Sequence, residues 1–155
     1  MSSHAALDLA AEAGPPRVGA FRRALRRWLG EALQARQTAA GASSVLDDDL
    51  EDLADDLVLA TSEALENVVD HAFANATGPG SMTLRADLVD DVVTIVVSDD
   101  GRWRDPTTGP TSRGRGLTLM ESLTDVEVVH GPTGTMVTMR RPLPAPAHER
   151  TSAQA

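Results

Sequence analysis

The sequence predicts an α+β fold, a two-layer sandwich in which helices cover one face of a mixed, mostly antiparallel sheet. Two long segments in the first half of the chain repeat apolar residues at helical spacing. The second half holds two pairs of short segments with the alternation or the β-branched content of strands, each pair joined by a short turn. Because the helices and hairpins are segregated along the chain, we expect the helices to pack together on one side of the sheet.

The N-terminal part predicts a short strand followed by an amphipathic helix. Residues 5–13 alternate weakly and end at a Gly-Pro-Pro breaker, which indicates a short edge strand. Residues 17–36 carry an apolar helical stripe of Phe21, Leu25, Trp28, Leu29 and Ala32. Four arginines lie on the outer sides of this helix: Arg22, Arg23, Arg26 and Arg27. They form either a docking surface for an acidic partner or a solvated face, and the composition favours the solvated face.

A second, longer helix is predicted over residues 47–74. The acidic run at its start, residues 47–56, complements the positive end of a helix dipole, and this role is favoured over that of a metal cluster. The apolar positions then continue at helical spacing from Leu50 through Leu57 to Ala64. A strong breaker, residues 75–81 with Gly-Pro-Gly inside it, ends the helix.

The C-terminal half predicts two hairpins separated by a loop and a short helix. Residues 82–88 and 92–97 form the first hairpin, and residues 126–130 and 135–140 form the second. Residues 102–113 have no periodicity and are interpreted as a mobile loop before a short helix at residues 117–123. Residues 142–155 are rich in Pro, Ala and polar residues, so we expect a disordered tail after a single domain at residues 1–141.

Composition excludes several classes of function. All fourteen basic residues are arginine, so the lysine of a phosphate-binding P-loop, of the protein-kinase fold and of Schiff-base enzymes is missing. The chain has no cysteine, hence neither disulfides nor thiolate metal ligands. A net charge of −9 argues against direct nucleic-acid binding. There is no signal pattern and no apolar run near the ~20 residues that span a bilayer, so we expect a soluble cytoplasmic protein.

The segment TSEALENVVDHAF, residues 61–73, places three polar side chains in register. Glu63, Asn67 and His71 fall at i, i+4 and i+8, one ridge on a helix of 3.6 residues per turn, beside an apolar stripe. A solvated face explains any one of them alone. Three in register, followed by two glycine-bearing loops, indicate a site.

Two later segments point to a nucleotide or phosphate ligand. Gly114-Arg115-Gly116-Leu117 forms a glycine-flanked loop that opens a helix, where free backbone N–H groups and the helix dipole attract an anion. Asp99 lies at the end of a strand, where its carboxylate can accept a hydrogen bond from an exocyclic amine.

Together these segments resemble the boxes of the GHKL ATPase superfamily, which includes gyrase, histidine kinases and a heat-shock chaperone. The matching boxes are Glu63-x-x-x-Asn67-x-x-x-His71-Ala72, Asp99-x-Gly101, Gly114-x-Gly116-Leu117-x-Leu119-Met120 and Gly134-Thr135. The short length and the Gly-Arg-Gly-Leu form of the second glycine box are most similar to bacterial anti-sigma factor serine kinases. The similarity covers roughly residues 7–141.

The resemblance implies a role for each matching position. Asn67 would ligate Mg²⁺, a hard cation suited to oxygen ligands. Asp99 would accept the adenine amino group, Gly101 would let the base lie close to the backbone, and Thr135 would reach the adenine edge. Gly114, Gly116 and Leu117 would form the phosphate-binding box, with Arg115 as a counter-charge. Glu63 would be the general base.

The function that this resemblance implies is an ATP-dependent anti-sigma factor. It would bind a sigma factor, and it would transfer the γ-phosphate of ATP to a serine or threonine of an anti-anti-sigma (STAS-type) antagonist. The family also suggests a homodimer.

Two other functions stay open. One is a nucleotide-gated binding module with little or no kinase activity, in which ATP orders the loop at residues 102–113. The other is a metal-binding or structural domain, which is disfavoured because Glu63 and His71 are about 12 Å apart along a helix axis. Trp103 departs from the family by replacing a glycine of the first glycine box, which puts the details of that loop and of the transfer activity in question. His71 is expected to support the site rather than to react.

Overall fold

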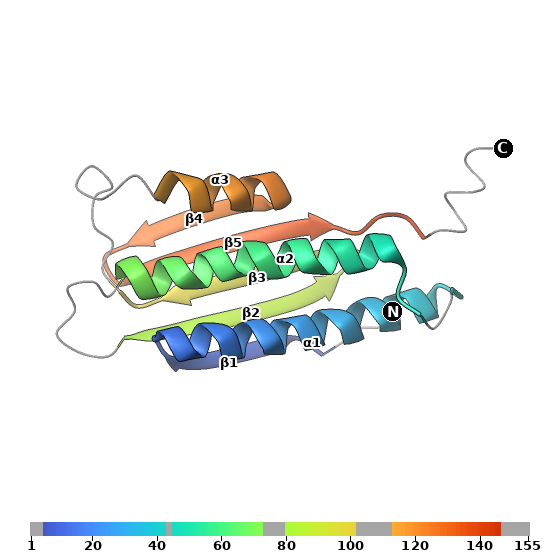
Figure 1. Cartoon of the computed structure of the whole chain (residues 1–155), viewed down its shortest axis with the longest axis horizontal. Helices are drawn as coiled ribbons and strands as arrows, with labels where there is room; N and C mark the ends of the chain where they lie inside the picture. Colours follow the sequence, from blue (N-terminus) through green and yellow to red (C-terminus); the bar gives the residue numbers. More distant parts are fainter. Residues whose placement is uncertain (1–4, 43–44, 73–79, 102–112, 147–155) are drawn as a thin grey trace.

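The computed structural model describes residues 5–42, 45–72, 80–101 and 113–146, with the side chains of residues 71–72 and 113–115 left out. It contains one five-stranded sheet in the order β1-β2-β3-β5-β4. The helices all lie on one face of this sheet, which confirms the predicted two-layer α+β fold (Figure 1). All four strand pairings are antiparallel, so no parallel pair occurs among the described strands. The elements are β1 (Leu7–Glu12), α1 (Pro15–Ala39), α2 (Asp48–Asn67), a π-helical turn η1 (Val68–Ala72), β2 (Ser81–Val89), β3 (Val92–Asp99), α3 (Arg113–Leu123), β4 (Asp125–Gly131) and β5 (Gly134–Pro142).

The sheet follows the two-residue alternation of its strands. In β2 and β3, Leu84 pairs with Val97 and both are buried beneath the helices. In β5, Met139 pairs with Ile95 of β3 and is also fully buried. The predicted edge strand is confirmed, since β1 forms the outer strand next to β2. Both predicted hairpins are confirmed as well, each one or two residues longer at its ends than the pattern indicated.

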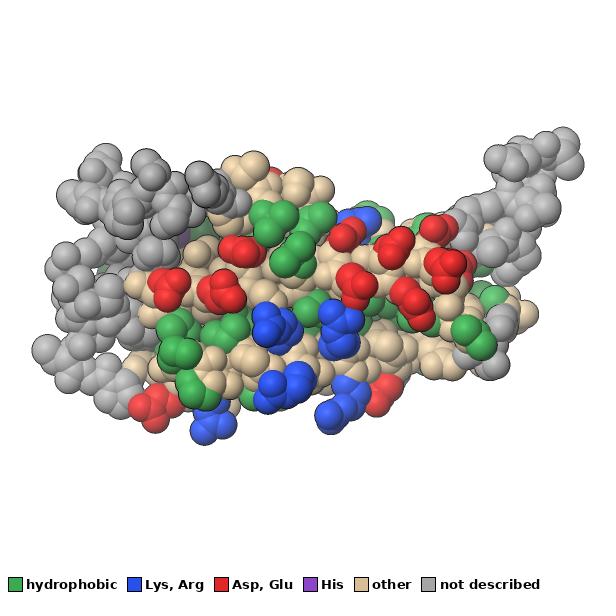
Figure 2. Space-filling model, in the orientation of Figure 1, with side chains coloured by type: hydrophobic (Ala, Val, Ile, Leu, Met, Phe, Trp, Pro, Cys, Tyr) green, Lys and Arg blue, Asp and Glu red, His purple; other side chains and the backbone are tan. Residues whose placement is uncertain are grey.

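Leucines from α1 and α2 fill the layer between the helices and the sheet. Leu25, Leu29 and Leu33 of α1 are fully buried, as are Leu57 and Leu65 of α2. The opposite sides of both helices are charged, and Figure 2 shows acidic side chains gathered over α2 and arginines over α1. The four α1 arginines named above are exposed as expected. Arg26 reaches Asp55 of α2 at 2.6 Å between two exposed side chains, a pair that adds little stability.

The second helix differs from the prediction at its end. Asp47 caps it, because its carboxylate accepts the N–H of Asp49 at 2.9 Å. The regular α-helix then stops at Asn67, and Val68–Ala72 forms a π-helical turn, whereas the predicted residues 73–74 lie outside the described part of the chain. Val68 and Val69 are two consecutive β-branched residues, whose restricted χ1 angle lowers their helix propensity, and they lie where the π-helical turn begins. Such turns are frequent at functional sites.

The third helix also begins earlier than expected. Its first residue is Arg113, so the second glycine box forms the first turn of α3 and not a loop that precedes it. Apolar residues on the second turn, above all the buried Met120, hold this helix against the core.

The expected C-terminal tail is ordered at its start. The N–H of Leu143 donates to the carbonyl of Asp91 at 2.7 Å, and Arg36 donates to the carbonyl of Pro144 at 3.1 Å. Residues 142–146 therefore pack against the body of the fold, whereas residues 147–155 lie outside the described part of the chain. The predicted mobile loop, apart from Arg113, and Trp103 within it also lie outside it. Among the helices that the structure describes, none has the length and hydropathy that a bilayer span requires.

Candidate nucleotide-binding site

The predicted site residues come from elements that meet at one end of the molecule. The C-terminal end of α2, the start of α3, the end of β3 and the start of β5 all lie at the left of Figure 1. The chain reverses direction between these elements, since α2 and α3 lead toward and away from this end, as do β3 and β5. Residues far apart in sequence therefore lie together at one end of the sheet, where β3 ends and β5 begins.

Glu63 and Asn67 lie directly beneath the second glycine box. Both are half-buried on the last turns of α2, one helical turn apart. A Cβ atom built on Gly116 would lie 3.2 Å from Oε2 of Glu63 and 3.5 Å from Nδ2 of Asn67. A Cβ atom at this position would therefore press on the Glu63 carboxylate, and glycine leaves this space free. Three residues of two predicted boxes thus lie close together.

Asp99 forms the second part of the site. Its Oδ1 accepts the backbone N–H of Gly101 at 2.9 Å, and the backbone of Thr135, its partner across β3 and β5, also hydrogen-bonds to the carboxylate. Burial raises the pKa of the Asp99 carboxyl, and these two hydrogen bonds oppose part of that rise. The nearby Asp100 raises this pKa further, whereas the imidazole of His130 lowers it. A partly desolvated carboxylate is a strong acceptor for a neutral N–H donor.

Gly134 fixes the distance between β5 and the Asp99 backbone. Its φ of +145° lies where residues with a side chain are strained, and a Cβ atom there would be 1.9 Å from the carbonyl oxygen of Asp99. The sequence motif Gly134-Thr135 therefore has a physical reason, because glycine is the only residue that lets Thr135 start its strand beside Asp99.

His130 is a residue of this site that the sequence motifs did not single out. It pairs with Thr135 across β4 and β5, and its Nδ1 lies 3.3 Å from Oγ1 of Thr135. The signal that could have found it is the turn between the strands: Gly131 pairs with Gly134, which places His130 opposite Thr135.

The remaining predicted residues are placed less completely. Gly114 and Arg115 lie in the first turn of α3, and their side-chain surroundings are outside the described structure, as are those of His71. Leu117 is 38% exposed and turns away from the core.

The described residues fit a bound nucleotide with a divalent cation. Gly114 and Gly116 lie in the N-terminal turn of α3, where the helix dipole favours phosphate. Within the described residues no three Asp, Glu, His or Cys side chains gather to hold a metal. A magnesium ion held by one protein oxygen, such as Oδ1 of Asn67, and by phosphate oxygens needs no such cluster.

Comparisons with known proteins show the family to which this chain belongs. The model of the histidine kinase-like ATPase domain matches residues 11–141. A serine-protein kinase RsbW from Staphylococcus aureus (strain MRSA252) is 31% identical over 109 residues, covering 61% of this chain and 66% of that protein. An anti-sigma F factor from Caldanaerobacter subterraneus subsp. tengcongensis is 33% identical over 120 residues, covering 69% of this chain and 82% of that protein. The chain thus spans just under two thirds of the length of the RsbW relative.

Solved structures support the fold. The RsbU and RsbW domains of Rv1364c from Mycobacterium tuberculosis match with a TM-score of 0.59 at 24% identity, over 90% of this chain and 33% of that one. The histidine kinase domain of Erythrobacter litoralis EL346 matches with a TM-score of 0.52 at 23% identity, over 77% and 61% of the two chains. The resemblance seen in the sequence boxes is therefore confirmed, and the chain belongs to the family of histidine kinase-like ATPase domains.

Proposed function

We propose that this protein is an ATP-dependent serine/threonine protein kinase that acts in the cytoplasm as an anti-sigma factor. Its single domain covers the predicted residues 1–141 and the adjoining residues 142–146 that pack against it. The observation that carries the proposal is the close approach of Gly116 to Glu63 and Asn67, whose side chains would lie 3.2 and 3.5 Å from a Cβ atom built on this glycine. It joins the phosphate box to the carboxylate and the amide that kinase chemistry needs. The names of the relatives, a serine-protein kinase and an anti-sigma factor, support the same assignment.

In this proposal ATP binds with its base toward β3 and β5. Asp99 accepts the adenine amino group, Gly101 lets the base approach the backbone, and Thr135 contacts the adenine edge. The phosphates lie on the first turn of α3, at Gly114, Gly116 and Leu117, with Arg115 as a counter-charge. The amide oxygen of Asn67 holds Mg²⁺, which when bound neutralises charge on the phosphate oxygens.

Glu63 supplies the base for transfer. Its carboxylate removes the proton from a serine or threonine hydroxyl of the substrate protein as that oxygen bonds to the γ-phosphorus. The bond from the γ-phosphorus to the β,γ-bridging oxygen breaks, and ADP leaves. Glu63 is half-buried on a regular helix, so its backbone is fixed before the substrate arrives.

The proposed substrate is an anti-anti-sigma antagonist of the STAS type, and the proposed bound partner is a sigma factor. Unphosphorylated antagonist would compete for the kinase and release the sigma factor, whereas phosphorylated antagonist would not. The anti-sigma name of one relative supports the sigma factor as partner. A homodimer, also suggested by the family, completes the proposal.

The test is transfer of label from γ-labelled ATP with Mg²⁺ in a soluble extract of the source cell. We expect an acid-stable phosphoprotein band with the wild type and a loss of about 10²–10⁴-fold with Glu63→Gln, which keeps the size of the side chain but removes the base. Binding of Mg·ATP should stay nearly unchanged in this variant. Glu66→Gln, an exposed glutamate on the same helix, is the matched control and should transfer like the wild type.

Two other results would contradict the proposed kinase activity. If both proteins bind ATP and neither labels a protein, the nucleotide-gated binding module replaces the kinase. If the wild type binds no ATP, the assignment of the site is wrong.

A further inference from the structure

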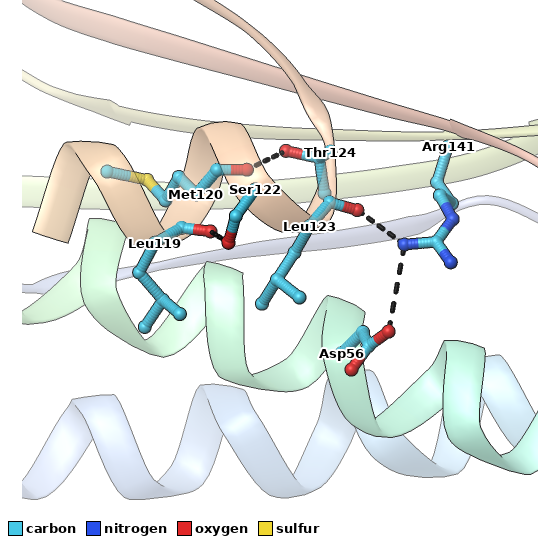
Figure 3. A network of polar contacts seen from close by, with 7 residues as sticks. All are labelled: Asp56, Leu119, Met120, Ser122, Leu123, Thr124 and Arg141. Atoms are coloured by element: carbon cyan, nitrogen blue, oxygen red, sulfur yellow. Dashed lines mark hydrogen bonds and ion pairs between the residues drawn. The ribbon is translucent and has the colours of Figure 1, made fainter.

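Arg141 links three elements at the end of α3 that lies away from the glycine box. Its Nη1 donates to the carbonyl oxygen of Leu123 at 2.5 Å and lies 3.7 Å from Oδ2 of Asp56 on α2 (Figure 3). Arg141 itself belongs to β5, two residues after the buried Met139, and therefore faces the helices. One side chain thus ties β5, α2 and α3 together.

The C-terminal end of α3 is otherwise capped by its own neighbours. Thr124 donates to the carbonyl of Met120 through both its N–H and its hydroxyl, each at 2.9 Å, and the hydroxyl of Ser122 donates to the carbonyl of Leu119 at 2.7 Å. These bonds are local and hold the helix end together. The contact of Arg141 with Leu123 connects this end to β5 through a charged group, and a cation here also suits the negative end of the helix dipole.

The contacts at the two ends of α3 have the same spacing on both helices. At one end Gly116 meets Glu63, and at the other Leu123 meets Asp56 through Arg141. Seven residues separate the two positions on each helix, about 10.5 Å and close to two full turns. The helices α2 and α3 run antiparallel. The two contacts therefore lie on the same side of α2, one at each end of α3, and the Arg141 contact fixes the position of α3 along α2.

We infer that Arg141 is a positioning residue for the phosphate site: by anchoring the end of α3 to Asp56, it sets where Gly116 lies over Glu63 and Asn67. This inference rests on the proposed function. A shift of α3 by one residue would move Gly116 about 1.5 Å along α2 and leave the adenine contacts on β3 and β5 in place. Arg141 is therefore expected to affect the phosphates of the nucleotide and not its base.

The experiment compares Arg141→Gln with Arg140→Gln. Arg140 directly precedes Arg141 in β5, is exposed on the other face of the sheet and lies 4.0 Å from Glu127, so it is a matched control. Binding of Mg·ATP and of adenosine is measured for both variants, together with amide hydrogen exchange of residues 113–120 without nucleotide. We expect Arg141→Gln to weaken Mg·ATP binding roughly tenfold and to leave adenosine binding unchanged. Exchange at the start of α3 should become faster, and Arg140→Gln should change none of these quantities.

Two further variants separate positioning from general loss of stability. Arg141→Lys keeps a cation that can reach the Leu123 carbonyl and should recover part of the ATP affinity. Asp56→Asn removes the ion pair without altering β5 and should weaken ATP binding in the same direction but less.

Each outcome decides the inference. Equal losses of ATP and adenosine binding in Arg141→Gln, or no loss of either, would overturn it. If the wild type binds no ATP, the proposed function fails, but hydrogen exchange still tests the anchor. Equal exchange of residues 113–120 in Arg141→Gln and Arg140→Gln would then refute it, and faster exchange in Arg141→Gln alone would support it.

Discussion

Replacing Gly134 by alanine tests the close approach of β5 to the Asp99 backbone. The new Cβ atom would lie 1.9 Å from the carbonyl oxygen of Asp99 and 2.9 Å from its carbonyl carbon, both backbone atoms that cannot rotate away. The φ of +145° adds strain of about 1–3 kcal/mol for a residue with a side chain. Relief of the overlap requires the strand ends to separate, which endangers one or two backbone hydrogen bonds at about 0.5–1.5 kcal/mol each.

The expected loss is about 2–5 kcal/mol of unfolding free energy. For a chain of 155 residues, this corresponds to a fall in Tm of roughly 5–15 °C. The assay is thermal unfolding followed by circular dichroism, without nucleotide. Gly131→Ala is the control in the same turn, because a Cβ there would be 3.7 Å from its nearest neighbour, an ordinary contact. A Tm of Gly134→Ala within about 2 °C of that control would show that the overlap is relieved cheaply and that the reasoning is wrong.

Two other substitutions separate stability from nucleotide binding. Because the folded-state pKa of Asp99 is raised above 3.8, the stability that its neutral form contributes is present below that value and is lost as the pH rises through the folded pKa. The unfolding free energy of Asp99→Asn, minus that of the wild type, should therefore increase between about pH 4 and about pH 7 in urea titrations, and a constant difference would contradict the raised pKa. Asp99→Asn should at the same time weaken ATP binding and discriminate poorly against GTP. Gly116→Ala should gain up to about 1 kcal/mol of helix propensity, since the flexible Glu63 side chain can move the few tenths of an ångström needed. The same variant should lose ATP affinity, measured by calorimetry. Unchanged affinity would mean that Gly116 is not part of the phosphate site.

The fold could be predicted from the sequence because its signals are periodic. The leucines of α1 repeat at helical spacing, the strands alternate, and Asp90 and Asp91 take the positive φ values, 51° and 59°, of a tight hairpin turn. The end of α2 could not be predicted in the same way. Apolar residues continue past Asn67 at the helical period, and the change to a π-helical turn at Val68 depends on packing that no periodicity records. The ordering of Leu143 and Pro144 likewise depends on distant partners, Asp91 and Arg36.

In the candidate site, too, some residues could be predicted from the sequence and others could not. Residues that would meet a ligand could be named from the sequence, since Glu63, Asn67 and Asp99 carry the chemical groups themselves. Residues that surround those groups have no such signature: His130 lies beside Thr135, and Arg141 contacts the end of α3. Arg141 is an arginine at a strand end, and nothing in its local sequence distinguishes it from Arg140, whose side chain lies on the opposite face of the sheet. Arg140 and Arg141 differ because side chains alternate along β5 and α3 lies over only one face of the sheet. A comparison of variants at these two positions therefore measures the effect of side-chain placement alone, since both residues are arginines.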